Sequence, residues 1–135
     1  MATRTQPAEN LIERLVIVVD DDSRVRESLR DLLGSAGLDP LCFSSAAALF
    51  DSGALARCGC LITDVRMPEI DGWELQRFVA AEYPHVFIIF ISAFQDQHAF
   101  ERALALGASA FLYKPFDGEE LLRTINSALS QSAGH

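Results

Sequence analysis

The chain has 135 residues, half of them hydrophobic, and a formal net charge of −8 at pH 7. This length suits one globular domain and is too short for two ordinary ones. The acidic balance argues against direct nucleic-acid binding, because the domain would repel phosphates. The longest apolar run, Val86–Ile91, is too short to span a membrane, and no signal-peptide core follows residues 2–10, so we expect a cytoplasmic protein with no membrane contact.

The hydrophobic pattern predicts strands that alternate with helices along the chain. Short apolar runs predict strands at residues 15–19, 40–43, 60–63, 86–91 and 110–113. Apolar residues at helical spacing predict helices at about residues 23–34, 45–53, 72–82, 96–106 and 118–129. Strict alternation favours an α/β fold, with a parallel sheet and helices on both of its faces.

Short polar residues and prolines mark the ends of several helices. We expect Asp22 or Ser23 to cap the first helix, Ser44 the second and Asp117 the last. Tyr83 ends the third helix, because the residue before a proline is pushed out of the helical region. The apolar side chains of this third helix are expected to serve helix packing and to have no chemical role: Trp73, Leu75, Phe78 and Val79.

Charged side chains follow three of the predicted strands. Asp20, Asp21 and Asp22 come directly after the first strand, Asp64 after the third and Lys114 after the fifth. In parallel sheets of this class, ligands gather outside the carboxyl ends of the strands. Lys114 is the only lysine of the sequence, and a compact ammonium suits a point contact to a phosphoryl oxygen or a carboxylate. The pattern predicts a cation-binding pocket that handles phosphoryl groups.

Each of these residues also has a purely structural interpretation. One acid of the Asp20–Asp22 run is explained by helix capping, whereas three adjacent acids exceed that need and repel one another unless they are neutralised. Asp64 taken alone would be weak evidence, because an aspartate at the end of a strand is common in turns. Ser92, directly after the fourth strand, is equally well explained as a cap, and Phe111 as a core aromatic residue.

Four segments together resemble the receiver domain of bacterial two-component response regulators. They are VVDDDS at 18–23, DVRMPEIDG at 64–72, ISA at 91–93 and FLYKPF at 111–116. The second segment resembles the branch related to nitrogen-fixation regulators. The resemblance covers residues 14–130 as the receiver domain, with an N-terminal lead at 1–13 and a C-terminal tail at 131–135. It implies the flavodoxin-like doubly wound sheet, five parallel strands in the order 2-1-3-4-5 with five helices.

The resemblance also implies the covalent site and its metal. Asp64 matches the aspartate that accepts the phosphoryl group. Asp20 and Asp21 match the acidic pair that holds Mg²⁺ together with Asp64, and the backbone carbonyl of Arg66 is implied as a further ligand. Asp22 is a third acid beside the pair. The sequence therefore leaves open which of the three acids hold the cation directly, because the pair could be displaced by one position.

Three further positions are implied to respond to phosphorylation. Ser92 matches the hydroxyl position, Lys114 the lysine that precedes a proline, and Phe111 the aromatic switch position. Phe111 lacks the hydroxyl of a tyrosine, so any switch must work through packing. The output surface is implied to be the helix at Asp96–Leu106, the fifth strand and the last helix, which would bind a downstream effector or form a homodimer.

These features predict a signalling domain rather than a dedicated enzyme. It is expected to take its phosphoryl group from a histidine kinase or phosphotransfer protein. One alternative is a small aspartate-nucleophile phosphatase, although Asp64-Val65-Arg66 lacks the second acid of its Asp-x-Asp motif. Another is a receiver-like interaction module that no longer takes phosphate. We expect a stand-alone relay regulator in preference to a fragment of a transcription factor.

Overall fold

The computed structural model describes residues 15–67, 69–93, 97–106 and 108–133. Its strands are β1 (Leu15–Val19), β2 (Leu41–Phe43), β3 (Cys58–Asp64), β4 (Phe87–Ala93) and β5 (Ala110–Lys114). Its helices are α2 (Ser23–Ser35), α3 (Ala46–Ser52), α4 (Gly72–Glu82), α5 (Gln97–Ala105) and α6 (Gly118–Ala133), with a 3-10 turn η2 (Ala54–Arg57) after α3. In this part of the chain no helix is long and apolar enough to cross a membrane.

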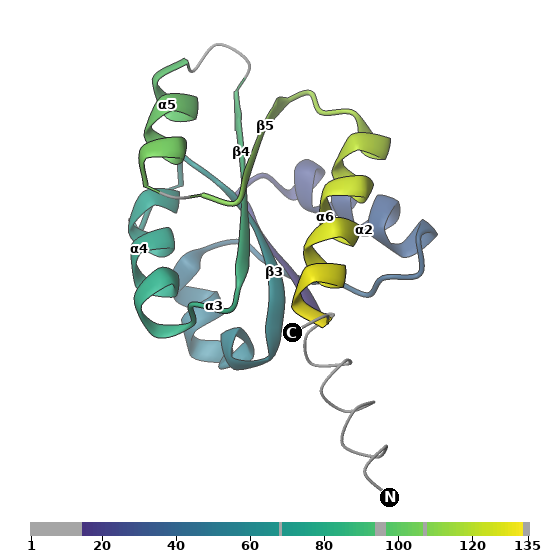
Figure 1. Cartoon of the computed structure of the whole chain (residues 1–135), viewed down its shortest axis with the longest axis horizontal. Coiled ribbons are helices and arrows are strands. Elements are labelled where there is room, and N and C mark those ends of the chain that lie inside the picture. Colours follow the sequence, from purple (N-terminus) through teal and green to yellow (C-terminus); the bar gives the residue numbers. More distant parts are fainter. Residues whose placement is uncertain (1–14, 68, 94–96, 107, 134–135) are drawn as a thin grey trace, which may run out of the picture.

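The strands form one parallel sheet in the order β2-β1-β3-β4-β5. Helices α3, α4 and α5 lie on one face of the sheet, and α2 and α6 lie on the other (Figure 1). A parallel sheet covered on both faces buries every side chain of its central strands, which explains their continuous apolar runs. The predicted flavodoxin-like fold and its strand order are confirmed.

Alternate strand residues contribute to two separate cores, because successive side chains point to opposite faces. The core beneath α2 and α6 contains Val16, Val18, Ile62, Ile91, Leu29, Leu121 and Ile125. The core beneath α3, α4 and α5 contains Ile17, Val19, Leu61, Phe90, Leu49, Trp73 and Leu75. The two cores hold the sheet rigid, so the residues that follow its strands have fixed positions.

Most helix ends follow the predicted chemistry, with two differences. Ser45, and not Ser44, caps α3 by accepting a hydrogen bond from the backbone N–H of Ala48. Helix α6 continues to Ala133 and so includes the first three residues of the predicted tail at 131–135, because polarity alone does not end a helix. Phe78 is 42% exposed on α4 and so lies at the surface, where its ring packs against Phe50 of α3, which agrees with its predicted role in helix packing.

Candidate functional site

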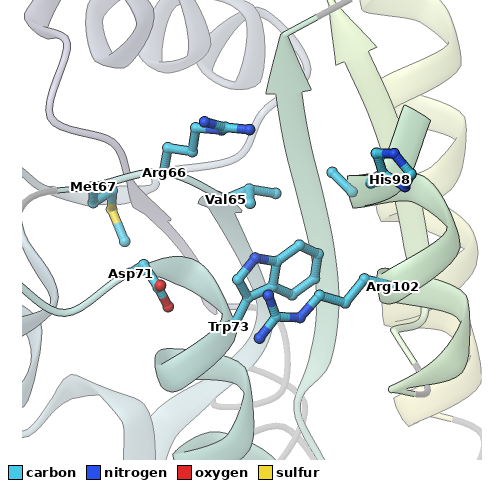
Figure 2. A pocket seen from close by; sticks show the side chains of 8 residues that line it. Val65, Arg66, Met67, Asp71, Trp73, His98 and Arg102 are labelled. Carbon is cyan, nitrogen blue, oxygen red and sulfur yellow. The ribbon is translucent and has the colours of Figure 1, made fainter. Parts of the chain in front are cut away.

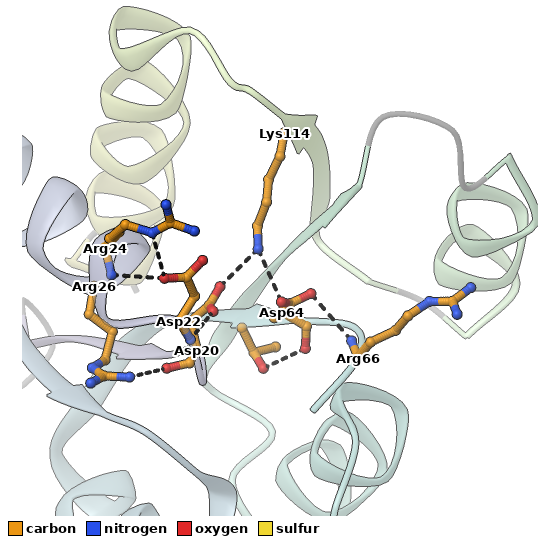
Figure 3. Close-up of polar contacts among 8 residues, drawn as sticks. Asp20, Asp22, Arg24, Arg26, Asp64, Arg66 and Lys114 are labelled. Atoms are coloured by element: carbon orange, nitrogen blue, oxygen red, sulfur yellow. Dashed lines mark hydrogen bonds and ion pairs between the residues drawn. The ribbon is translucent and has the colours of Figure 1, made fainter. Parts of the chain in front are cut away.

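The polar side chains of the site lie where three strands of the sheet end, β1 and its neighbour β3, and β5 beyond β4. Asp20 follows β1, Asp64 ends β3 and Lys114 ends β5. The Lys114 Nζ donates to Asp20 Oδ2 at 3.1 Å and to Asp64 Oδ2 at 3.0 Å (Figure 3). Residues that are far apart in the sequence therefore meet at one edge of the sheet, as the strand-end pattern predicted.

The acidic run after β1 divides into two functions. Asp20, Asp21 and Asp64 each offer a carboxylate oxygen, and these oxygens lie within 4.8 Å of one another. Asp22 lies outside this group. Its side chain caps α2 by accepting from the backbone N–H of Arg24, and it forms an ion pair with the Arg24 side chain at 3.5 Å. Helix capping thereby accounts for Asp22, the third acid of the run.

Burial and neighbouring charges determine the protonation of the pocket. Asp20 is 1% exposed, and burial raises the pKa of its carboxyl above the ordinary 3.8, with a further increase from the charge of Asp64. Burial by itself would lower the pKa of Lys114, but its hydrogen bonds and ion pairs with Asp64 and Asp20 outweigh burial and raise the pKa. Three carboxylates face one ammonium, so an added cation is favoured here.

The loop after β3 is held closely against Asp64. The backbone N–H of Arg66 donates to Asp64 Oδ1 at 3.3 Å, and the N–H of Gly72 donates to the Val65 carbonyl at 2.8 Å. A Cβ at position 72 would overlap the carbonyl oxygen of Asp64, so only glycine permits this approach. The sequence predicted a turn here, but it gave no sign that Gly72 packs against the backbone of Asp64.

Ser92 and Phe111 lie on the neighbouring strands β4 and β5, where Phe111 pairs with Phe90 and Ser92 with Tyr113. The register pairs Asp64 with Ile91, so Ser92 is the next residue toward the edge, where it is 2% exposed. Phe111 is half-buried in β5. Its ring makes edge contacts with Phe100 of α5, at a centroid distance of 5.6 Å, and with Tyr113, at 5.2 Å.

One contact at the site was missed from the sequence. Arg26, on the first turn of α2, donates through Nη1 to the backbone carbonyl of Asp20 at 2.7 Å. This bond ties α2 to the end of β1 and fixes the backbone that carries the acidic pair. A single arginine among several on an amphipathic helix carries no sequence signal that distinguishes it from a solvated one.

The fold and this edge define a phosphoryl-handling α/β domain of the flavodoxin-like class. The chain belongs to the response regulator receiver domain family, whose model matches residues 16–126. It is 48% identical over 118 residues to the response regulator protein TmoT of Ectopseudomonas mendocina, covering 87% of this chain and 53% of that protein. It is 42% identical over 118 residues to the transcriptional regulatory protein FixJ of Azorhizobium caulinodans, covering 87% of this chain and 56% of that protein.

Solved structures agree with this assignment. The response regulator StyR matches with a TM-score of 0.79 and 41% identity, over 89% of this chain and 61% of that one. A response regulator receiver protein from Burkholderia phymatum matches with a TM-score of 0.77 and 39% identity, over 86% and 94%. The chain is therefore a receiver domain of the two-component response regulators, and it spans about half the length of the curated relatives that it matches.

Proposed function

We propose that Asp64 accepts the phosphoryl group of a phosphohistidine, carried by a histidine kinase or a phosphotransfer protein. The observation that supports this role is the ammonium of Lys114, which hydrogen-bonds at once to Asp64 and to the buried Asp20. Asp64 is the member of the acidic group that ends a central strand, with its side chain partly exposed. A donor can therefore reach it, while the neighbouring charges are already fixed.

The transfer itself needs little covalent chemistry from the protein. The P–N bond of the phosphohistidine breaks, a P–O bond to the Asp64 carboxylate forms, and the released imidazole takes up a proton from solvent. Catalysis depends on positioning and on neutralising the charge of the transferred oxygens. Lys114 supplies one positive charge for this purpose and Ser92 a hydroxyl hydrogen bond. Hydrolysis of the aspartyl phosphate by water, with release of inorganic phosphate, returns the domain to its starting state.

The same edge fits Mg²⁺. The clustered oxygens of Asp20, Asp21 and Asp64 are the donor type that this ion prefers. Burial, and to a lesser extent the charge of Asp64, raise the pKa of Asp20, and a bound cation would favour its ionised form. These three side chains would hold the ion, together with the backbone carbonyl of Arg66. When bound, Mg²⁺ supplies positive charge next to the transferred phosphoryl oxygens.

The response to phosphorylation is proposed to leave through α5, β5 and α6. Phosphorylation replaces one negative charge on Asp64 by roughly two. Ser92 is drawn toward the new oxygens, and Phe111 turns into the space that is released, which shifts the population of two conformations. Phe111 touches Phe100 of α5, so this helix receives the change directly. Its exposed apolar side chains suit an effector or a second copy of the domain.

The covalent site is tested by mass spectrometry. We expect acetyl phosphate with Mg²⁺ to add one phosphoryl group to the wild type and none to Asp64→Asn. The control is Asp31→Asn, which makes the same change at an exposed aspartate of α2 and should react like the wild type. An undiminished adduct on Asp64→Asn would contradict the proposal. A wild type that takes no phosphoryl group would favour the receiver-like interaction module.

The metal site is tested by calorimetric titration with Mg²⁺. We expect Asp21→Ala to lose at least ten times more affinity than Asp22→Ala, since Asp22 is engaged in capping α2 and lies outside the carboxylate group. Removal of Mg²⁺ by a chelator should also abolish phosphorylation of the wild type. Equal losses in the two variants would show that the metal-binding pair is displaced by one residue.

A further inference from the structure

Helix α5 is attached to the domain by little apolar contact. Its fully buried side chains are two alanines, Ala99 and Ala103, and the ring of Phe100, which is 36% exposed, packs against Phe111 and Tyr113. Leu104, and Leu106 directly after the helix, are exposed. Small buried side chains contribute little hydrophobic stabilisation, because the free energy follows the apolar area removed from water. The polar contacts of α5 therefore have a large share in fixing its position.

The C-terminal end of α5 is held by a buried polar side chain from α4. Gln76 is 3% exposed, and its Nε2 donates to the backbone carbonyl of Leu106 at 3.1 Å. The last carbonyls of a helix have no partner within the helix, and one left unpaired costs free energy when it is shielded from water. The turn is closed further by bonds from the N–H of Leu106 to Arg102 and from the N–H of Ala108 to Ala103, at 3.0 and 2.9 Å.

The other half of α5 borders open space. A cleft of about 410 Å³ separates it from the start of α4 and the loop after β3 (Figure 2). Val65, Met67 and Trp73 line one wall, and His98, Ala99 and Arg102 of α5 line the other. The Arg102 guanidinium lies 4.7 Å from the centre of the Trp73 ring across this cleft. The N-terminal half of α5 thus has room to move that the C-terminal end lacks.

We propose that Gln76 is a positioning residue that anchors the C-terminal end of α5, so that phosphorylation moves the N-terminal half of the helix about this anchor. The inference rests on the proposed function of Asp64. The residue that would transmit the change, Phe111, contacts Phe100 in the N-terminal half of α5. A movement of Phe111 therefore displaces the N-terminal half of α5 first. Because the bond from Gln76 to Leu106 holds the other end, the helix changes its tilt relative to the sheet.

The wild type gives the first test. Beryllofluoride with Mg²⁺ mimics the phosphoryl group, and amide shifts are followed by NMR along α5. We expect shifts at residues 98–101 to be at least three times larger than those at Leu106 and Ala108. Equal shifts at both ends would overturn the anchor, and this result needs no variant to fold.

The second test removes the anchoring bond. Gln76→Met keeps the side-chain length without the donor, and we expect amide exchange at Leu106 and Ala108 to accelerate about fivefold, which corresponds to one net hydrogen bond. Beryllofluoride shifts should then extend to these two residues. The control is Gln97→Met, the same substitution at an exposed position of α5, with unchanged exchange at Leu106. Unchanged exchange and an unchanged shift pattern in Gln76→Met would overturn the proposal.

The two proposals fail in different ways. If Asp64→Asn still acquires the phosphoryl group, the assignment of Asp64 is wrong, while exchange at Leu106 in Gln76→Met still decides whether Gln76 anchors α5. If Asp64 is the acceptor and the mass adduct of Gln76→Met forms normally, then shifts that are equal along α5 in the wild type contradict the anchor alone.

Discussion

Helices α5 and α6 lie on opposite sides of β5, yet they are attached to the sheet in different ways. Four side chains of α6 are fully covered: Leu121, Ile125, Ala128 and Leu129. In α5 only two alanines are covered, and Leu104 is 60% exposed. Each large apolar side chain that is fully buried contributes about 1.5–3 kcal/mol, against about 0.8 kcal/mol for the single methyl group of an alanine.

This difference suits a structural role for α6 and the proposed responsive role for α5. A helix fixed by buried side chains such as Leu121, Ile125 and Leu129 cannot shift without opening cavities, because protein interiors are closely packed. Helix α5 is held by two buried methyl groups, the partly exposed ring of Phe100 on Phe111 and Tyr113, one buried glutamine and one arginine on a tryptophan ring, so it can change its position at lower cost. The weakly attached helix is also the one in contact with Phe111, so the fold leaves α5 free to move beside the residue proposed as the switch.

The largest expected effect on the free energy of unfolding comes from truncating a buried apolar side chain in each helix. Ile125→Ala in α6 should reduce the free energy of unfolding by about 3 kcal/mol, from lost burial and a residual cavity. Ala103→Gly in α5 should reduce the free energy of unfolding by only about 1–2 kcal/mol, because it lowers helix propensity and removes one buried methyl group. The control for propensity is Ala105→Gly, at an exposed position of α5. Urea denaturation measures all three, and an equal loss in Ile125→Ala and Ala103→Gly would break the comparison.

An intermediate effect is expected where Arg102 contacts Trp73. Arg102→Met keeps much of the side chain and removes the cation, so stability should fall by about 0.5–1 kcal/mol. Trp73 is the only tryptophan of the sequence, so its fluorescence reports on this contact. We expect beryllofluoride to change the emission of the wild type and to change that of Arg102→Met by less than half as much. A full response in the variant would mean that α5 moves without altering the contact.

The smallest effect on stability is expected on the outer surface of α5. Leu104→Ser should change the free energy of unfolding by no more than about 0.5 kcal/mol, because the side chain already lies mostly in water. The same change should weaken phosphorylation-dependent self-association or effector binding at least fivefold, as measured by sedimentation. Asn126→Ser on the exposed side of α6 provides the matched control. Normal association of Leu104→Ser would place the output surface elsewhere.

The sequence by itself determined the alternation of strands and helices and the edge where the chemistry gathers. Parallel strands need long apolar runs, and these runs can be read directly at Leu15–Val19 and Phe87–Ala93. Because the carboxyl ends of parallel strands share one edge, Asp20, Asp64 and Lys114 could be grouped before any contact was known. Local rules also worked at Gly53, which ends α3 in the left-handed conformation.

Only the tertiary structure decided how the three acids are divided and how α5 is held. The sequence favoured Asp20 and Asp21 as a pair but allowed a displacement by one residue. In the structure Asp22 caps α2, while its two neighbours lie beside Asp64. Gln76 meets the carbonyl of Leu106 across 30 positions of the chain. Contacts of this kind depend on how two helices pack, and helical periodicity describes each helix separately.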